Sequence, residues 1–311
     1  MKLLVTGGAG FIGSNFVRRI LAGHYGPISS LQILDKFTYA SDLSLIEELT
    51  NYGIEIVVGD ICDESKVGRI LRNIDCVVNF AAESHVDRSI SNPTPFVVTN
   101  ILGTQILLKQ AIANSVQVFV QVSTDEVYGS IYAGQFDEKS NLNPSSPYAA
   151  SKAAGDLLAL SFQKTFGLDV RITRSVNNFG PHQHPEKLIP NFILRLLRGE
   201  KLPLYGNGLN VREWIYVEDN CDAIFSVIQK GVSGEIYNIG SGVERSNQEI
   251  ANLLVDLLDA DPGMIEYTED RKGHDFRYAL NSEFAFKTLG LQPKIDFLEG
   301  MAKTIAWYKS F

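Results

Sequence analysis

LLVTGGAGFIG, residues 3–13, joins a short apolar run to a turn with glycines at positions 7, 10 and 13. The apolar run predicts a buried strand over residues 3–6, and a helix is expected from residue 14 to 22. Glycine at these three positions permits a tight turn, close approach of the backbone to a pyrophosphate, and close packing of helix on strand. The free N–H groups at the helix start would then face the phosphates. The stretch therefore predicts a dinucleotide-binding unit.

Three further apolar runs continue the alternation of strands with helices. The first, residues 31–34, ends at Asp35, which stands 22 positions after Gly13. An acid about 20 residues past the glycines accepts from the 2′-hydroxyl of the adenosine ribose and repels a 2′-phosphate, so NAD is expected rather than NADP. The others, residues 54–58 and 76–80, lead to Asp60, a candidate acceptor for the adenine amino group, and to small alanines. We predict a Rossmann-type, doubly wound parallel sheet with a smaller, mixed α/β C-terminal substrate lobe.

A polar cluster follows another apolar run, residues 116–122, at the carboxyl end of a predicted strand. The cluster contains Thr124, Asp125 and Glu126. Downstream, a serine–proline pair is typical of a helix start and puts Tyr148 and Lys152 one turn apart on the same helix face. A phenol loses its proton near pH 10, and a neighbouring lysine cation lowers that pKa, so this pair is a candidate general base for an alcohol. In the alternative interpretation, the acids are solvated loop residues and the tyrosine is an ordinary half-buried side chain.

The composition argues against several classes of protein. The chain has 311 residues, 28 of them basic and 36 acidic, with a net charge of −8 and a pI near 5.2. This balance argues against a nucleic-acid or anionic-membrane surface. We expect no signal peptide and no stretch that approaches a membrane span of about 20 residues. Three cysteines without metal-ligand spacing suit a reducing cytoplasm, and His182 with His184 lacks matching partners for zinc, so no metal is predicted.

A long helix is predicted over residues 94–114, with apolar side chains almost all round it. A helix with so little polar face is buried on more than one side. Burial within a single subunit would satisfy this pattern. We prefer a homodimer interface that this helix forms with the helix of Tyr148, which is itself rich in alanine and leucine.

The second half of the chain has a less regular pattern. Residues 177–181 are interpreted as a turn and residues 203–208 as a loop, and Asp219 is expected to cap a helix that ends near residue 229. The other expected elements are strands over residues 168–173, 211–217 and 236–239, and helices over 188–198 and 247–258, the last opened by a capping box at 246–249. The predicted domains are a cofactor domain, residues 1–180, to which residues 211–240 return, and a substrate lobe, residues 181–311.

Motifs along nearly the whole chain resemble the extended short-chain dehydrogenase/reductase family, and in particular its nucleotide-sugar 4,6-dehydratases. In the first half the motifs are TGGAGFIG at 6–13, DKFTYA at 35–40, AAESHVDRSI at 81–90 and STDEVYG at 123–129. In the second half they are NNFGP at 177–181, PEKLIP at 185–190, VREWIYVEDN at 211–220 and R-x-G-H-D-x-R-Y at 271–278. The Asp–Glu pair is the most specific of these signals, because epimerases and decarboxylases of similar fold usually lack it.

The resemblance implies a reaction on a nucleotide-activated glucose, dTDP-glucose. C4 would be oxidised, water would be eliminated across C5 and C6, and the hydride would return to C6, with NAD as the retained cofactor. A nucleotide-sugar 4-epimerase, a UDP-sugar 4,6-dehydratase and a non-catalytic NAD-binding protein are the alternatives. The chain departs from the usual family pattern at Ser41 and Asp42, at Ser175 and Val176, and at Asn281.

The same resemblance assigns site residues. The chemistry would be carried by Thr124, Asp125, Glu126, Tyr148 and Lys152. Cofactor contacts would come from Gly7, Gly10, Phe11, Ile12, Gly13, Asp35, Lys36, Phe37, Thr38, Asp60, Ile61, Phe80, Ala81, Ala82, Ser84, Thr99, Tyr148, Lys152 and Asn178. Besides the three polar catalytic residues of the strand end, the nucleotide-sugar site would be lined by Ser84, Asn177, Lys187, Leu188, Pro203, Tyr205, Arg212, Asn247, Arg271, His274 and Tyr278.

Overall fold

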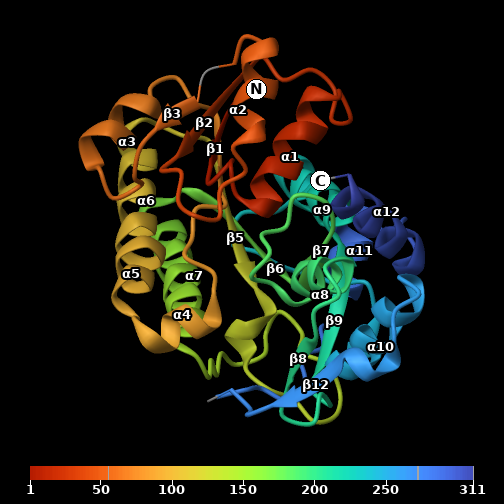
Figure 1. Cartoon of the computed structure of the whole chain (residues 1–311). Helices are drawn as coiled ribbons and strands as arrows, with labels where there is room; N and C mark the ends of the chain where they lie inside the picture. The colour runs from red at the N-terminus through yellow and green to blue at the C-terminus, as the bar shows by residue number, and fades with distance from the viewer. Residues whose placement is uncertain (55, 272, 311) are drawn as a thin grey trace.

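The computed structural model describes residues 1–54, 56–271 and 273–310, and its centre is a seven-stranded parallel sheet (Figure 1). The strands follow the order β10-β6-β5-β4-β1-β2-β3. Their bounds are β1 (Lys2–Thr6), β2 (Ser30–Asp35), β3 (Ile56–Val58), β4 (Cys76–Asn79), β5 (Val118–Thr124), β6 (Asp169–Ser175) and β10 (Ile236–Ile239). The central strands are apolar runs rather than alternating patterns because both faces of the sheet are covered.

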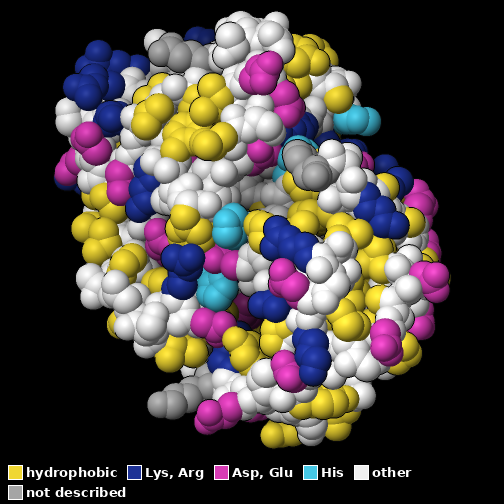
Figure 2. Space-filling view, viewed as in Figure 1, with side chains coloured by type: hydrophobic (Ala, Val, Ile, Leu, Met, Phe, Trp, Pro, Cys, Tyr) yellow, Lys and Arg dark blue, Asp and Glu magenta, His cyan; other side chains and the backbone are white. Residues whose placement is uncertain are grey.

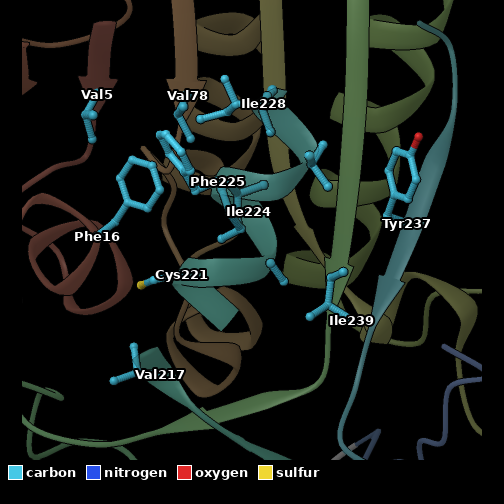
Figure 3. Close-up of a cluster of buried hydrophobic side chains, with 14 of the residues drawn as sticks. Val5, Phe16, Val78, Val217, Cys221, Ile224, Phe225, Ile228, Tyr237 and Ile239 are labelled. Carbon is cyan, nitrogen blue, oxygen red and sulfur yellow. The ribbon is translucent and has the colours of Figure 1, made fainter. Parts of the chain in front are cut away.

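Two layers of helices enclose the sheet. One face carries α1 (Phe11–Leu21), α2 (Ser44–Asn51), α9 (Val217–Lys230) and α11 (Glu283–Leu289), and the other carries α3 (Glu64–Ile70), α6 (Thr104–Ala113) and α7 (Pro147–Phe166). On the first face, Val5, Phe16 and Phe225 belong to one buried cluster (Figure 3). On the second, Leu4 and Phe119 belong to another. This arrangement confirms the predicted doubly wound fold.

The strand order reverses between β1 and β4, and open α/β sheets bind their ligands at such a switch point. Because all the strands are parallel, their carboxyl ends lie at one edge of the sheet. The glycine turn follows β1, Asp35 ends β2 and Thr124 ends β5. Three segments that the sequence singled out therefore meet at the same edge.

Most elements of the second half of the chain form a smaller unit, on the right of Figure 1. Its sheets are β11-β9-β7, from β7 (Asn177–Phe179), β9 (Val211–Tyr216) and β11 (Glu244–Ser246), and the pair β8 (Leu202–Tyr205) with β12 (Ile265–Thr268). The helices α8 (Leu188–Leu197), α10 (Asn247–Leu257) and α12 (Phe297–Lys309) pack on a separate apolar cluster that includes Phe192 and Trp214. β10 belongs to the main sheet and β9 does not, and the division of the chain at residue 180 stays a prediction.

Two expected irregular segments are strands. The predicted turn at 177–181 begins with β7, and the predicted loop at 203–208 begins within β8. Both strands are three or four residues long. A run this short is set by pairing with distant strands, here β9 and β12, and has no periodicity of its own for the sequence to show.

The predicted helix cap at Asp219 is also wrong. α9 begins earlier, at Val217, so Asp219 lies inside its first turn. Its carboxylate accepts hydrogen bonds from the backbone N–H groups of Lys294 and Ile295, both at 3.0 Å. Asp219 thus fastens the segment before α12 to α9, a contact between residues 75 positions apart.

The long apolar helix is present but irregular. α5 (Thr94–Phe96) and α6 are separated by a wider π-helical segment, η1 (Val97–Gly103). Within η1, the buried Asn100 side chain binds both backbone polar groups of Glu83, at 2.9 and 3.0 Å, and donates to the Ser151 hydroxyl at 2.8 Å. π-helical turns are frequent at functional sites, and this one connects the turn after β4 to α7.

Residues 94–113 also correct the expectation about membrane spans. Among the described residues, this is the one helical segment long and apolar enough to cross a membrane, with 20 residues and a mean hydropathy of 1.3. Half of it is buried inside the protein, and core helices pass the same test of length and composition. The segment is therefore weak evidence for a span.

Three residues of the predicted elements lie outside the described part of the chain. They are Glu55 in the predicted strand 54–58, Lys272 in the basic segment 271–278, and Phe311 at the end of the predicted lobe.

Candidate active site

A cavity of about 290 Å³ opens at the carboxyl edge of the main sheet. Its walls come from the turns after β1, β2, β4 and β5, from the first turns of α7, and from the segment between β6 and α8. Figure 2 shows the molecule hollowed between its upper and lower parts, with histidine and charged side chains around the hollow. Segments far apart in the sequence thus share one cavity.

The glycine turn leaves no room for side chains. Gly7 has a φ of +66°, and a Cβ there would lie 2.6 Å from the backbone nitrogen of Ala81. A Cβ on Gly13 would lie 2.3 Å from the carbonyl oxygen of Gly7. The cavity floor is therefore bare backbone in front of the amino end of α1, where unpaired N–H groups favour anions. This cradle fits the pyrophosphate of a dinucleotide.

Asp35 lies at the cavity wall with both carboxylate oxygens bonded to backbone. One oxygen accepts from the N–H of Ala9 at 2.9 Å and the other from the N–H of Phe37 at 2.8 Å. Asp35 thereby ties the glycine turn to the next loop, a role that the sequence did not reveal. Oδ1 also accepts from the Ser41 hydroxyl at 3.4 Å, but Oδ2 can accept a second hydrogen bond, so a ribose hydroxyl still fits.

The other predicted cofactor residues support the same fit. Asp60 accepts from the N–H of Cys62 at 2.9 Å, and it lies 3.4 Å from the ammonium of Lys36. The amide oxygen of Asn178 is buried and has no hydrogen-bond partner among the described residues, so it can receive a donor from a bound molecule. Every predicted cofactor residue except Phe37 lines the cavity.

The acid cluster forms a tight turn. β5 ends at Thr124 and passes into the 3₁₀ helix η2 (Asp125–Tyr128). The Thr124 hydroxyl donates to Asp125 at 3.0 Å and accepts from the N–H of Glu126 at 3.3 Å. All three side chains line the cavity. The threonine therefore holds the Asp125 carboxyl and the backbone of Glu126.

α7 carries the other two predicted catalytic residues, Tyr148 and Lys152. The helix begins at Pro147 as predicted, and the hydroxyl of Ser146 accepts from the N–H of Ala149, the third residue of the helix, at 3.1 Å. The Lys152 ammonium donates to the carbonyl of Val122 at 2.6 Å. This bond connects α7 directly to the strand that leads to the acids, so all five predicted catalytic residues lie together.

The two acids lie in different electrostatic environments. Burial raises the pKa of Asp125 well above its ordinary value, and the charge of Glu126 raises it further. Burial also raises the pKa of Glu126, but the cations Arg212, Lys187 and Arg271 oppose that rise. Asp125 therefore favours its protonated form, whereas Glu126 is stabilised as a carboxylate by three cations.

The predicted net lowering of the Tyr148 pKa is wrong for this structure, because effects other than the Lys152 charge dominate. Burial raises the pKa of the Tyr148 phenol, and the carboxylates of Glu126 and Asp125 also raise it. Burial lowers the pKa of Lys152 to about 8. The sequence shows that the two side chains share a helix face, but it does not show that both are removed from water or that two acids face the phenol.

The predicted substrate residues fall into two groups. Ser84, Asn177 and Lys187 line the cavity beside the catalytic residues, and the Lys187 ammonium donates to the carbonyl of Ser84 at 2.8 Å. The second group lies beyond the cavity walls: Leu188, Pro203, Tyr205, Arg212, Asn247, Arg271, His274 and Tyr278.

Contacts connect part of this second group. The Arg212 guanidinium lies 4.5 Å from the ring centroid of Tyr278. The rings of Tyr205 and His274 meet edge to face at 6.4 Å. Arg271 lies 3.6 Å from a carboxylate oxygen of Asp87. Leu188 and Asn247 stand at the first positions of α8 and α10, and Pro203 lies within β8.

One polar group of this region was not predicted. The carboxylate of Asp275 accepts from the hydroxyl of Tyr278 at 2.5 Å and from the hydroxyl of Ser145. It thus fastens the segment 271–278 to the residue before the cap of α7. The sequence shows an acid among basic and aromatic residues, but it does not show the burial of that acid or its partner Ser145, 130 residues away.

His85 lies at the start of a short helix. Its imidazole accepts from the backbone N–H of Arg88 at 3.4 Å and so caps α4 (Val86–Ser91). The glutamates and histidine that line the cavity without having been predicted are Glu83, Glu186 and His184. Glu83 lies in the motif AAESHVDRSI and Glu186 in PEKLIP, and His184 was considered only as a zinc ligand. The sequence did not distinguish these three residues from their neighbours as members of the site.

The parallel sheet, the bare glycine cradle and the Tyr–Lys helix define an enzyme of the Rossmann class that uses a dinucleotide. A family model described as GDP-mannose 4,6 dehydratase matches residues 4–304, and the chain belongs to this family. It is similar to the dTDP-glucose 4,6-dehydratase of Streptomyces antibioticus, with 50% identity over 312 residues that cover 99% of this chain and 92% of that protein.

Solved structures of a dehydratase and an epimerase are also similar to this chain. DesIV, the dTDP-glucose 4,6-dehydratase of Streptomyces venezuelae with NAD bound, has a TM-score of 0.98 and 50% identity, covering 100% of this chain and 97% of that chain. The UDP-glucose 4-epimerase of Thermotoga maritima has a TM-score of 0.92 and 30% identity, covering 100% and 99%. Because a dehydratase and an epimerase share the fold, the fold alone does not define the reaction, and the residues of the site do.

Proposed function

We propose that the chain is an NAD-dependent hydro-lyase that converts dTDP-glucose to dTDP-4-keto-6-deoxyglucose. One observation carries this proposal. The acids Asp125 and Glu126 share a single cavity with Tyr148 and Lys152, beside the glycine cradle. A 4-epimerase also oxidises C4, but it has no use for a second acid–base pair.

Retention of the cofactor follows from the walls of the cavity. Gly7 and Gly13 leave space for the pyrophosphate, Asp35 receives the ribose hydroxyl and repels a 2′-phosphate, and the amide of Asn178 offers a free acceptor. Bound NAD would supply the hydride acceptor for C4 and the hydride donor for C6. The net reaction is then a loss of water.

The first proton transfer is assigned to Tyr148. Its phenolic oxygen takes the proton of the C4 hydroxyl, while the hydroxyl of Thr124 holds the C4 oxygen. Lys152 keeps most of its charge at neutral pH because its pKa is about 8, and that charge favours the Tyr148 phenolate against burial and the two acids, which raise the Tyr148 pKa. Oxidation of C4 to a ketone makes the neighbouring C5 hydrogen acidic.

The elimination is assigned to the two acids. Glu126, stabilised as a carboxylate by three cations, removes the C5 proton. Asp125, whose pKa is raised by burial, retains a proton that it can give to the departing C6 oxygen. Two carboxyl groups one residue apart thus take opposite roles because their environments differ.

The diphosphate of the substrate needs local cations in an acidic protein. Lys187, Arg212 and Arg271 all act on Glu126, so they lie within electrostatic range of the bound sugar nucleotide. We assign them to the diphosphate, with the rest of the second group around the nucleoside. Arginine binds a phosphate through paired N–H groups, which suits this role.

We also propose that the protein is a homodimer. η1 and α7 pack side by side, and both present apolar side chains to the solvent: Val97 is 51% exposed, Leu102 48% and Leu157 58%. A second copy of the same surface would bury them. The division at residue 180 and a cytoplasmic location belong to the proposal as well, the latter supported by the free thiols of Cys62, Cys76 and Cys221.

The proposed reaction is tested by the masses of the products. The purified protein is given dTDP-glucose and, separately, UDP-glucose. The proposal predicts a product lighter than dTDP-glucose by one water and little reaction of UDP-glucose. A product of unchanged mass with inverted C4 would show an epimerase, and faster dehydration of UDP-glucose would reassign the nucleotide.

A further inference from the structure

A buried ion pair that the mechanism above does not use lies next to the catalytic residues. Asp156 on α7 is 0% exposed and Arg174 on β6 is 2% exposed, and the guanidinium Nε lies 2.9 Å from Oδ2 of the carboxylate. Removing two charges from water costs free energy that their attraction often fails to recover, so an apolar pair would fold as well. A role beyond stability would account for this ion pair.

Asp156 faces the catalytic lysine. It stands four residues after Lys152 on the same helix, so the two side chains share one face. Burial lowers the pKa of Lys152, and the carboxylate of Asp156 is the charge that opposes this effect. The second oxygen of Asp156 is buried without a hydrogen-bond partner among the described residues, so Arg174 does not saturate the carboxylate.

Arg174 faces the acid turn. Its guanidinium carbon lies 4.8 Å from the ring centroid of Tyr128, the last residue of η2. The Tyr128 hydroxyl in turn donates to Asn238 at 2.9 Å, on the neighbouring strand β10. Arg174 thus touches both the helix of the Tyr–Lys pair and the turn of the two acids.

We propose that Asp156 and Arg174 are positioning residues for the dehydration, in which Asp156 is the counter-charge of the buried Lys152 ammonium and Arg174 holds the helix and the acid turn at a fixed spacing. The inference rests on the proposed function. It concerns residues of this chain that touch neither substrate nor cofactor.

The sign of the expected effect follows from the surrounding charges. The carboxylate of Asp156 acts on Lys152 and Tyr148 of its own helix, and Arg174 of β6 acts on Asp156. Without the carboxylate of Asp156, the ammonium loses its proton at lower pH, since burial then acts unopposed. Activity that needs cationic Lys152 is lost as pH rises, so this loss should begin earlier in Asp156→Asn.

The experiment follows the first hydride transfer in a Glu126→Gln background, where reduced nicotinamide accumulates and is measured by its absorbance across pH about 6 to 10. Asp156→Asn should move the alkaline limb of the rate to lower pH by about one unit, the size of a shift caused by one near charge. Asp156→Glu, which keeps the charge, should leave the limb in place.

The double variant Asp156→Asn/Arg174→Gln separates positioning from folding. It removes both charges and keeps polar side chains, so thermal stability should return toward the parent while the alkaline limb stays shifted. Asp169→Asn, in the Asp169–Arg171 pair of the same strand, is the matched control and should shift nothing.

The outcomes are distinct. An unshifted limb in both the single and the double variant would overturn the inference and leave the proposed function intact. If the Glu126→Gln parent itself formed no reduced nicotinamide from dTDP-glucose, the proposed function would fail instead. Nucleotide released from each variant on denaturation shows whether the cofactor is still held.

Discussion

Asp125 and Glu126 are neighbours in the sequence, and the structure separates them by their surroundings. Asp125 is buried and Glu126 is partly buried; Arg212 lowers the pKa of both, but Lys187 and Arg271 act in addition on Glu126. The pair itself was predictable from the motif. The division of roles was not, because it depends on where three distant side chains lie after folding.

Asp125→Asn should separate activity from stability. The folded-state pKa of Asp125 is raised, so above the ordinary carboxyl pKa of 3.8 the unfolded chain ionises this group more readily than the folded protein does. Wild-type stability therefore carries a penalty at neutral pH, which asparagine removes. The variant should melt at higher temperature than the wild type at pH about 7, and turnover should fall about 10²–10⁴-fold.

The same variant should lose its advantage in acid. At pH about 2.5, well below the ordinary carboxyl pKa of 3.8, both folded and unfolded wild-type chains hold the Asp125 proton, so the two melting temperatures should approach each other. Thermal unfolding followed by circular dichroism at both pH values makes the comparison. A lower melting temperature for Asp125→Asn at neutral pH would mean that the carboxylate is satisfied in the folded protein.

At the scale of elements, local signals predicted those parts of the chain that local interactions define. The glycine turn, the start of α7 at Pro147 and the capping box at Ser246 are found where the sequence puts them. β7 and β8 were missed because pairing with distant strands makes them. The π-helical η1 was missed for a similar reason, since the bonds of Asn100 to Glu83 and Ser151 accompany it.

The start of α7 matters for both stability and rate. Ser146→Ala removes the hydrogen bond that the N–H of Ala149 donates to the Ser146 hydroxyl, and loss of such a cap costs about 1 kcal/mol. Because Tyr148 stands at the second position of the helix, fraying should also slow the first hydride transfer. The matched control is Asp296→Ala, which removes the cap of α12 away from the cavity. It should lower the melting temperature similarly and leave that step unchanged; equal slowing in both variants would contradict this account.

At the scale of the whole molecule, the doubly wound sheet was predictable because strand, glycine turn and helix repeat in order along the first half. The placement of the second half was not, since β10 returns to the sheet while β9 stays in a smaller one. The ion pair of Asp156 with Arg174 was not predicted either, because it too depends on how distant elements pack. Neither charge stands out in the sequence of its element, and their pairing appears only when α7 lies on β6.

The dimer proposal is tested by charging the apolar surface of η1 and α7. Leu102→Glu/Leu157→Glu should convert a dimer into a monomer of about 34.4 kDa, because a buried apolar contact would become like-charge repulsion. Sedimentation velocity at micromolar concentration measures this. Leu298→Glu, equally exposed at 55% but on α12, is the control and should stay dimeric. A monomeric wild type at that concentration would refute the interface.

The central claim is that Tyr148 serves the oxidation at C4 and Glu126 the elimination that follows. The most direct measurement is the fate of dTDP-glucose in Glu126→Gln, followed by absorbance of reduced nicotinamide and by exchange of the C5 hydrogen with deuterated water. The account predicts that reduced nicotinamide accumulates while C5 exchange and product formation fall about 10²–10⁴-fold. Tyr148→Phe should form little reduced nicotinamide at all. Normal turnover with normal C5 exchange in Glu126→Gln would contradict the assignment of Glu126 as the base.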